Sequence, residues 1–286
     1  MRAGDLFRLL LLAAIWGGSF VFLRVLAPAL GPILTADLRA LIAWAALSLY
    51  LRAVGLDIQW RRFWKQYLII GALNAALPFS LFAFAALHIP ASYSAILNAT
   101  SPLFGALFSA LWIGEKITAP KVLGLVLGIA GVALVTRLAP GERDSMVVWA
   151  MIACLLAAVC YGSVSVYTKK FAAAVKPTAI SAGSQLMAGL LLLPFVPFAP
   201  APGPITLLVP VNMILFAVSC SAVAFLLYFR LIADIGPTKA LTVTFLMPAF
   251  TMIWAAIFLS EGVTASMIFG CALILGGTGL VVGHKA

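Results

Sequence analysis

Long apolar runs separated by short polar and charged stretches alternate along the whole of this chain. Runs such as Leu9 to Phe22, Leu38 to Leu51 and Val122 to Val135 contain few or no charged residues. With their flanks they approach the roughly 20 residues that an α-helix needs to cross a hydrocarbon core of about 30 Å. They do not alternate with polar residues at every second position, as the strands of a membrane barrel would. The pattern therefore predicts an all-α integral membrane protein.

Glycine, proline and charged residues mark the ends of ten predicted transmembrane helices. These helices are expected near residues 6–27, 32–52, 66–87, 91–113, 120–137, 147–169, 177–197, 208–230, 238–259 and 265–283. The first run continues to Phe22 without a small-residue cleavage site, so we interpret it as a spanning helix and not as a signal peptide. The predicted connections are too short to hold a soluble catalytic domain.

Composition agrees with lipid as the main solvent of this surface. Of the 286 residues, 64% are hydrophobic and only 9% are charged. A net charge of +10 would suggest nucleic acid as the partner of a soluble protein, but here the basic residues lie at the ends of apolar runs. We therefore expect a lipid bilayer and no nucleic acid as partner. The four cysteines lie in apolar segments without metal-ligand spacing, so neither a metal, a disulfide nor a cofactor is expected.

The distribution of basic residues predicts the orientation of the helices. If the N-terminus is cytoplasmic, only four of the 18 Lys and Arg residues lie outside, namely Arg24, Arg39, Arg137 and Arg143. Such an asymmetry follows the positive-inside rule. We expect a multi-pass protein of a bacterial inner membrane with both termini in the cytoplasm.

The two halves of the chain share a repeated pattern. Three pairs of residues are each 146 positions apart: Pro102 and Pro248, Glu115 and Glu261, and Gly124 and Gly270. The Trp16-Gly17 and Tyr161-Gly162 pairs match at an offset of 145. The pattern predicts two five-helix repeats, residues 1–140 and 141–286. Because five is odd, the second repeat must be inverted relative to the first, as in many secondary transporters.

The segment ILNATSPLFGALFSALWIGEKI, residues 96–117, has an apolar helix, a proline and a terminal Glu. In this pattern, and over nearly the whole chain, the halves resemble the EamA module of the drug/metabolite transporter superfamily. Within that superfamily, the chain is most similar overall to the YddG-type exporters of aromatic amino acids. The resemblance implies a central cavity that opens alternately to either side and the export of a small metabolite.

A polar stripe on the fourth predicted helix is a candidate substrate site. Ser94, Asn98 and Ser101 recur at helical spacing on one face, and Pro102 frees a backbone carbonyl one turn earlier. These groups could bind either charged end of an amino acid. Alternatively, Asn98 only hydrogen-bonds a neighbouring helix. On the ninth helix, Thr244 and the residues around Pro248 form a thinner version of the same stripe.

Aromatic residues near small or polar neighbours are further candidates. Trp16, Tyr93, Tyr161 and Tyr228 could stack on an aromatic substrate, and packing in the core or at the membrane interface is the alternative for each.

Two polar residues occupy corresponding regions of helices two and seven. Arg39 could attract a substrate carboxylate, although a side chain that extends to the headgroups is the favoured interpretation. Gln185 offers donors and an acceptor without a charge, so it ranks above Arg39 as a cavity residue.

Prolines and glycines within the predicted spans suggest moving and packing elements. Pro78, Pro102 and Pro248 each remove a helical hydrogen bond, which creates either a hinge or a static bend. Glycines of helices five and ten form small-residue faces, which we assign to helix packing or to a homodimer contact; one chain is expected to suffice for transport.

The acidic residues and histidines all fall near predicted helix ends or in loops, so no central proton carrier is visible. We therefore expect facilitated export of amino acids, aromatic and other neutral ones, by alternating access. Proton-coupled antiport and export of another small neutral metabolite stay open. An intramembrane enzyme is the alternative of a different class, but neither an embedded histidine nor a paired carboxylate supports it.

Overall fold

A computed structural model describes residues 2–137, 144–235 and 243–283 of the chain. All regular secondary structure within these ranges is helical. Nine of the described helical segments are long and apolar enough to cross a membrane, and Val243–Leu259 is a shorter apolar helix. The ninth predicted helix was expected to begin at residue 238, and its residues 238–242 lie outside the described residues. The all-α membrane fold predicted from the sequence is confirmed.

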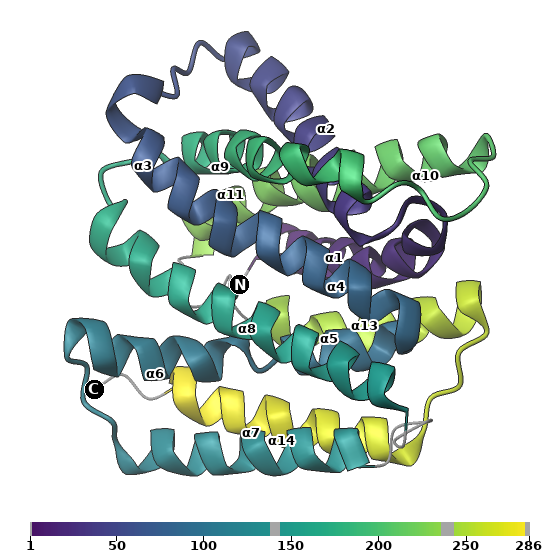
Figure 1. Cartoon of the computed structure of the whole chain (residues 1–286). Coiled ribbons are helices and arrows are strands. Elements are labelled where there is room, and N and C mark those ends of the chain that lie inside the picture. Colours follow the sequence, from purple (N-terminus) through teal and green to yellow (C-terminus); the bar gives the residue numbers. More distant parts are fainter. Residues whose placement is uncertain (1, 138–143, 236–242, 284–286) are drawn as a thin grey trace.

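The helices follow one another in the predicted order (Figure 1). In the first half they are α1 (Ala3–Leu30), α2 (Pro32–Ala53), α3 (Trp60–Gly71), η1 (Ala72–Ala76), α4 (Leu77–His88), α5 (Ala91–Asn98), α6 (Ser101–Ile113) and α7 (Ala119–Arg137). In the second half they are α8 (Ser145–Phe171), α9 (Pro177–Leu192), η2 (Leu193–Phe198), α10 (Leu208–Ala217), η3 (Val218–Val223), α11 (Ala224–Ile235), α13 (Val243–Leu259) and α14 (Ala265–Gly283). The third span begins at Trp60, earlier than predicted, because the charged turn before residue 66 is already helical.

Two spans contain a π-helical segment that the sequence analysis did not predict. In the third span it is η1, and in the eighth span it is η3, which begins 146 residues later. This is the same offset as that between Pro102 and Pro248. Pro78 has no N–H to donate to the carbonyl of Asn74, which accounts for the widened turn in η1. The second half has Ala224 at the corresponding position, and nothing in the structure explains η3 in the same way.

The fourth span is broken at the predicted proline. Helix α5 ends at Asn98 and α6 begins at Ser101, with Pro102 in its first turn. Since Pro102 cannot donate to the carbonyl of Asn98, the Ser101 hydroxyl donates to it instead, at 2.6 Å. In the ninth span, Pro248 lies inside the continuous helix α13.

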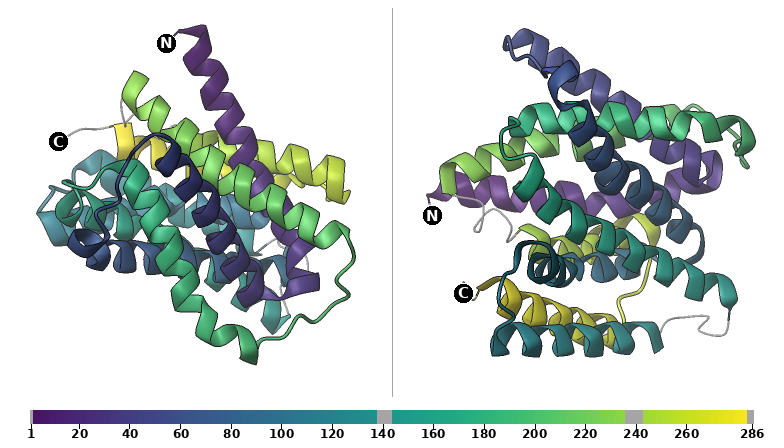
Figure 2. Two further views of the ribbon diagram at one scale, coloured as in Figure 1. Left: turned by 90° about the horizontal axis from the view of Figure 1, so that it is seen from above. Right: turned by 60° about the vertical axis from the view of Figure 1, so that its left-hand side comes forward.

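Contacts between the two halves occur in matched pairs. Helix α1 packs along α13, and its counterpart α8 packs along α6. Helix α4 packs against α8, and the eighth span packs in the same way against α1. The remaining counterparts pack on each other, α2 on α9 and α7 on α14, the last pair lying side by side at the bottom of Figure 1. The start of α1 and the end of α14 both lie at the left edge of the right-hand view in Figure 2.

The two glutamates that are 146 residues apart make equivalent ion pairs. Glu115, after α6, pairs with Lys169 on α8 at 3.0 Å, and Glu261, after α13, pairs with Arg24 on α1 at 3.3 Å. Glu261 also accepts hydrogen bonds from the backbone N–H of Ala91 at 2.9 and 3.2 Å. The Glu261 side chain is 10% exposed and that of Glu115 is 37% exposed, so the Glu261 end is more tightly held.

The Glu115 pair predicts a pH dependence of stability. A hydrogen bond from Lys169, together with the charges of Lys169 and Lys121, lowers the pKa of the Glu115 carboxyl from its usual value. A carboxyl whose pKa is lowered by folding stabilises the fold above its unfolded pKa of about 4.3, and this contribution is lost as the pH falls through the folded pKa. Glu115→Gln should therefore lower the melting temperature at pH 7, and the difference should shrink as the pH falls through the folded pKa.

The expected loss at pH 7 is below about 1 kcal/mol, because this ion pair is exposed and screened by water and salt. Melting of the purified variant and the wild type, compared across pH and at high salt, checks the prediction. A difference that stayed constant with pH would contradict it.

Candidate functional site

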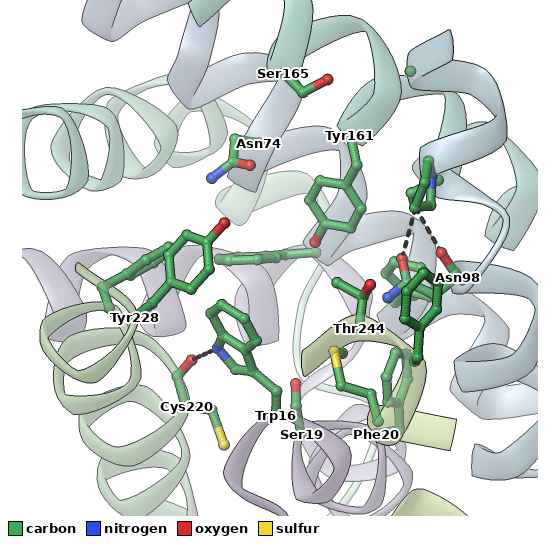
Figure 3. Close-up of a pocket in the computed structure, with 18 of the residues that line it drawn as sticks. Trp16, Ser19, Phe20, Asn74, Asn98, Tyr161, Ser165, Cys220, Tyr228 and Thr244 are labelled. Atoms are coloured by element: carbon green, nitrogen blue, oxygen red, sulfur yellow. Dashed lines mark hydrogen bonds between the residues drawn. The ribbon is translucent and has the colours of Figure 1, made fainter. Parts of the chain in front are cut away.

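A cavity of about 450 Å³ lies between the two halves of the bundle (Figure 3). Its wall is built from α1, α2, the third and eighth spans, the broken fourth span, α8, α13 and the end of α14. Pockets for small ligands typically have volumes of about 300–1,000 Å³ and few polar groups, and this one fits that description.

The structure brings most of the residues predicted for substrate binding into this wall. They are Trp16, Arg39, Asn98, Ser101, Tyr161, Tyr228 and Thr244, joined by Pro102. They come from segments that are far apart in the sequence, and Figure 3 shows several of them pointing into one space.

Three predicted binding residues lie elsewhere. Ser94 is buried against α8, where its hydroxyl accepts from the thiol of Cys154 at 3.5 Å. Tyr93 is fully buried in the main hydrophobic cluster. Gln185 on α9 is fully buried outside the cavity wall, and neither of its amide atoms has a hydrogen-bond partner in the described part of the chain. The prolines Pro78 and Pro248 are buried in their helices and do not line the cavity.

Arg39 does not extend to the headgroups, in contrast to the favoured interpretation of the sequence. Its side chain is buried, and its guanidinium carbon lies 3.7 Å from the ring centre of Phe79 and 4.3 Å from that of Phe216. Its Nε donates to the hydroxyl of Ser221 at 3.1 Å. No carboxylate of the described residues lies within 4 Å of it. Arg39 therefore reaches the cavity, whereas Gln185, its counterpart 146 residues later, does not.

Aromatic rings line the cavity from several helices. Trp16 and Tyr228 lie 5.3 Å apart between ring centres, with Phe225 edge-on to Trp16. The Trp16 indole N–H donates to the carbonyl of Cys220 at 3.1 Å, which fixes the ring against the eighth span (Figure 3). Tyr161 stacks on Phe82 across the cavity wall. These rings offer flat apolar surface with hydroxyl groups at the edges.

The broken fourth span contributes oxygen atoms. Asn98 is the last residue of α5, where helix carbonyls carry partial negative charge. Its side-chain oxygen accepts from the Ser101 hydroxyl at 3.2 Å. Thr244, which lines the cavity from α13, lies 146 residues after Asn98, so the two halves place polar side chains at equivalent positions.

Several cavity residues were missed by the sequence analysis. Asn74 and Cys220 lie in the two π-helical segments, and they too are 146 residues apart. Applying the repeat offset to polar residues of the third span would have singled out Asn74. Ser19 and Phe79 carried no signal of their own, because one is small and the other resembles any core aromatic residue.

The chemistry of the wall favours binding over reaction. Among the described residues that line the cavity, Arg39 is the only charged one. The other polar groups are amides, hydroxyls and one thiol. Such a site can hold a small molecule that carries one negative group and an apolar part.

Two repeated helical halves around a central cavity at membrane depth define a secondary membrane transporter. The chain belongs to the EamA-like transporter family, whose sequence model matches residues 4–137 and again 148–283. The family is part of the drug/metabolite transporter superfamily, and its members are transporters and not enzymes. The protein is accordingly a multi-pass membrane transporter for a small-molecule substrate.

Similar proteins span almost the same length. The uncharacterized transporter YvbV of Bacillus subtilis is 26% identical over 92% of this chain and 87% of its own. A protein of Streptantibioticus cattleyicolor named "probable terminal-alkyne amino-acid exporter" is 23% identical over 96% of this chain and 91% of its own. One solved crystal structure aligns with 98% of this chain and 96% of its own at a TM-score of 0.68 and 21% identity, which shows a shared fold.

Proposed function

We propose that this transporter exports neutral amino acids, aromatic ones among them, by alternating access down their concentration gradient. The observation that carries the proposal is Arg39, a buried cation in the cavity wall without a carboxylate partner among the described residues. A buried charge is costly unless it is paired, and a substrate carboxylate would pair it. A phosphate dianion would call for further cations, and the described wall has none.

The end of α5 and Thr244 are suited to the substrate ammonium. A helix C-terminus carries partial negative charge. The backbone carbonyl of Asn98 already accepts from the Ser101 hydroxyl at 2.6 Å, so the side-chain oxygen of Asn98 is the group offered to a cation. The side-chain oxygen of Asn98 lies at this end, and no carboxylate lines the described wall. Arg39 and Asn98 would thus bind opposite charges of a zwitterion, whose net charge is zero.

The aromatic wall supports an apolar side chain on the substrate. Trp16, Tyr161 and Tyr228 offer ring surface, and pairs of aromatic rings contribute about 0.5–1.5 kcal/mol beyond simple burial. The relative from Streptantibioticus cattleyicolor is named as an amino-acid exporter, which agrees with this class of substrate. The resemblance to the YddG-type exporters of aromatic amino acids points to the same substrate class and is part of this proposal.

The cavity reaches toward one end of the bundle, which is where a substrate would enter or leave in this conformation. The cavity extends to Ser109 on α6 and Val282 on α14, close to the ends of those helices. Under the positive-inside orientation this end faces the cytoplasm of a bacterium, with both termini on that side of the inner membrane. The two EamA-type repeats, residues 1–140 and 141–286, would alternately close the two ends, with Pro102 and the other prolines as candidate hinges.

Proton-coupled antiport is the second candidate, because Asp37 is a buried acid without an ion pair among the described residues, whereas the buried Asp5 pairs with Arg8. Asp37 lies near the start of α2, as the sequence predicted for all acids, but it is only 3% exposed. One of its oxygens has no hydrogen-bond partner in the described part of the chain, but Asp37 does not line the cavity. Uniport therefore stays the favoured mechanism.

Counterflow uptake of labelled tryptophan, phenylalanine, methionine and threonine into proteoliposomes tests the proposal. We expect uptake of the aromatic amino acids by the wild type, independent of an imposed pH gradient. Asn98→Ala should slow this uptake at least tenfold. A lost hydrogen bond to a charged group costs at least about 1.4 kcal/mol, which corresponds to a factor of ten. Asn212→Ala is the matched control, since Asn212 is half-buried on α10, does not line the cavity and bonds its own helix at Leu208.

Three outcomes would change this view. Absence of uptake of all four amino acids by folded protein would overturn the substrate class. Equal uptake by Asn98→Ala and Asn212→Ala would remove Asn98 from the site. Uptake that follows the pH gradient and becomes independent of it in Asp37→Asn would replace uniport with antiport.

A further inference from the structure

The π-helical segment η3 contacts two of the cavity residues directly. The hydroxyl of Ser221 accepts from Nε of Arg39 at 3.1 Å, and the carbonyl of the preceding residue, Cys220, accepts from the Trp16 indole at 3.1 Å. Ser221 is fully buried and does not line the cavity, so it is placed to act through Arg39 and not on the substrate itself.

The surroundings of Arg39 restrict how its guanidinium group can bind an anion. The two rings of Phe79 and Phe216 lie within 3.7 and 4.3 Å of the guanidinium carbon and take up space around it. A guanidinium has five N–H donors in a fixed plane, one on Nε and four on the two Nη atoms. With Nε bonded to Ser221, the edge formed by the two Nη atoms is left for a ligand.

The π-helical geometry places Ser221 for this contact. A π turn contains more residues than an α turn, so it shifts the side chains that follow, and such turns are frequent at functional sites. The segment η1 in the other half also faces the cavity, through Asn74, the counterpart of Cys220. Both halves thus use the widened turn at the same repeat position to form the site.

We propose that Ser221 is a positioning residue that orients Arg39 so that its two Nη atoms bind the substrate carboxylate end-on, with two parallel hydrogen bonds. This inference rests on the carboxylate site of the proposed function and adds the element that fixes its geometry. A paired, planar contact of this kind would distinguish a carboxylate from a single-point acceptor.

Initial rates of labelled tryptophan exchange in proteoliposomes test the role of Ser221. Ser221→Ala is expected to raise the apparent KM about tenfold, the effect of a lost hydrogen bond to a charged group, and to leave the maximal rate unchanged. Ser221→Thr keeps the hydroxyl and should restore the wild-type KM. Ser219→Ala is the matched control, because Ser219 lies in the same π-helical segment and bonds the carbonyl of Leu215 at 2.5 Å.

A double-mutant cycle separates positioning from a general structural role. Lysine lacks the fork that Ser221 orients, so adding Ser221→Ala to Arg39→Lys should raise KM no further. An additive loss, or a lower maximal rate with a lower melting temperature, would overturn the proposal in favour of a structural role. The positioning role would also be overturned if Ser221→Ala and Ser219→Ala had the same KM while transport still depended on Arg39. In that case the proposed function would stay intact. Absence of uptake by the wild type would overturn both.

Discussion

Proteoliposomes that contain Arg39→Gln are expected to take up labelled tryptophan about 100-fold more slowly than the wild type, at substrate concentrations below KM. The removal of one partner of a buried, hydrogen-bonded charge pair typically costs about 2–5 kcal/mol, and each 1.4 kcal/mol is a factor of ten. In the substrate-bound state, Arg39 and the carboxylate would be such a pair. Glutamine keeps some hydrogen-bonding capacity but neither the charge nor the paired donors.

Arg52→Gln is the control for the loss of one positive charge on the same helix, since Arg52 lies in the last turn of α2 and is not part of the cavity wall. Arg39→Lys should give a smaller loss, because lysine keeps the charge without the fork. Melting temperatures of the empty proteins check that unfolding is not the cause, because Arg39→Gln also removes the hydrogen bond to Ser221 and the contacts with two aromatic rings. Uptake by Arg39→Gln close to that of Arg52→Gln would place the carboxylate elsewhere.

The membrane fold was predictable because it depends on local and repeated features of the sequence. Apolar runs of spanning length identify the helices whatever their packing, and the proline and glutamate offsets reveal the two halves. The π-helical segments were not predictable in this way. Pro78 explains one of them after the fact, but the segment around Cys220 has no proline at the matching position.

The candidate site was predicted only in part, for geometric reasons. Ser94 and Asn98 share a helical face in the sequence, yet only Asn98 reaches the cavity, which lies at the broken end of α5. Arg39 and Gln185 are equivalent in the repeat. The sequence favoured Gln185 as the cavity residue, but Arg39 is the one that lines the cavity. Which face a helix turns inward depends on its rotation against its neighbours, and that rotation is set by packing that one sequence does not display.

The repeated scaffold carries different chemistry in its two halves. The residues at equivalent cavity positions are Trp16 and Tyr161, Asn98 and Thr244, and Asn74 and Cys220. None of these pairs is identical. A symmetric frame suits alternating access, because the same movement can close either end, whereas an amino acid has no symmetry and needs unlike groups around it. The differences between the halves are therefore the places where substrate selectivity is expected to reside.

Gly277→Ala is expected to destabilise the protein by about 1–3 kcal/mol, the usual effect of overpacking a filled interface. A Cβ atom on Gly277 would lie 2.4 Å from the carbonyl oxygen of Gly124 and 2.9 Å from the nitrogen of Gly128. Both are backbone atoms of α7, so no side chain can move aside and the two helices must separate. Differential scanning fluorimetry of the purified variants measures the effect.

Gly276→Ala is the matched control, one residue earlier on the same helix, where a Cβ atom would meet nothing within 4 Å. Alanine is the better helix former, so this variant should be as stable as the wild type or gain up to about 1 kcal/mol. The pair of variants also tests the two roles that the sequence left open for the glycine faces. In the structure, these faces pack α14 on α7 within one chain, so a Gly277→Ala monomer should melt earlier. If instead Gly277→Ala changed only the oligomeric state and had the same melting temperature as Gly276→Ala, the glycines would form a contact between two copies of the chain.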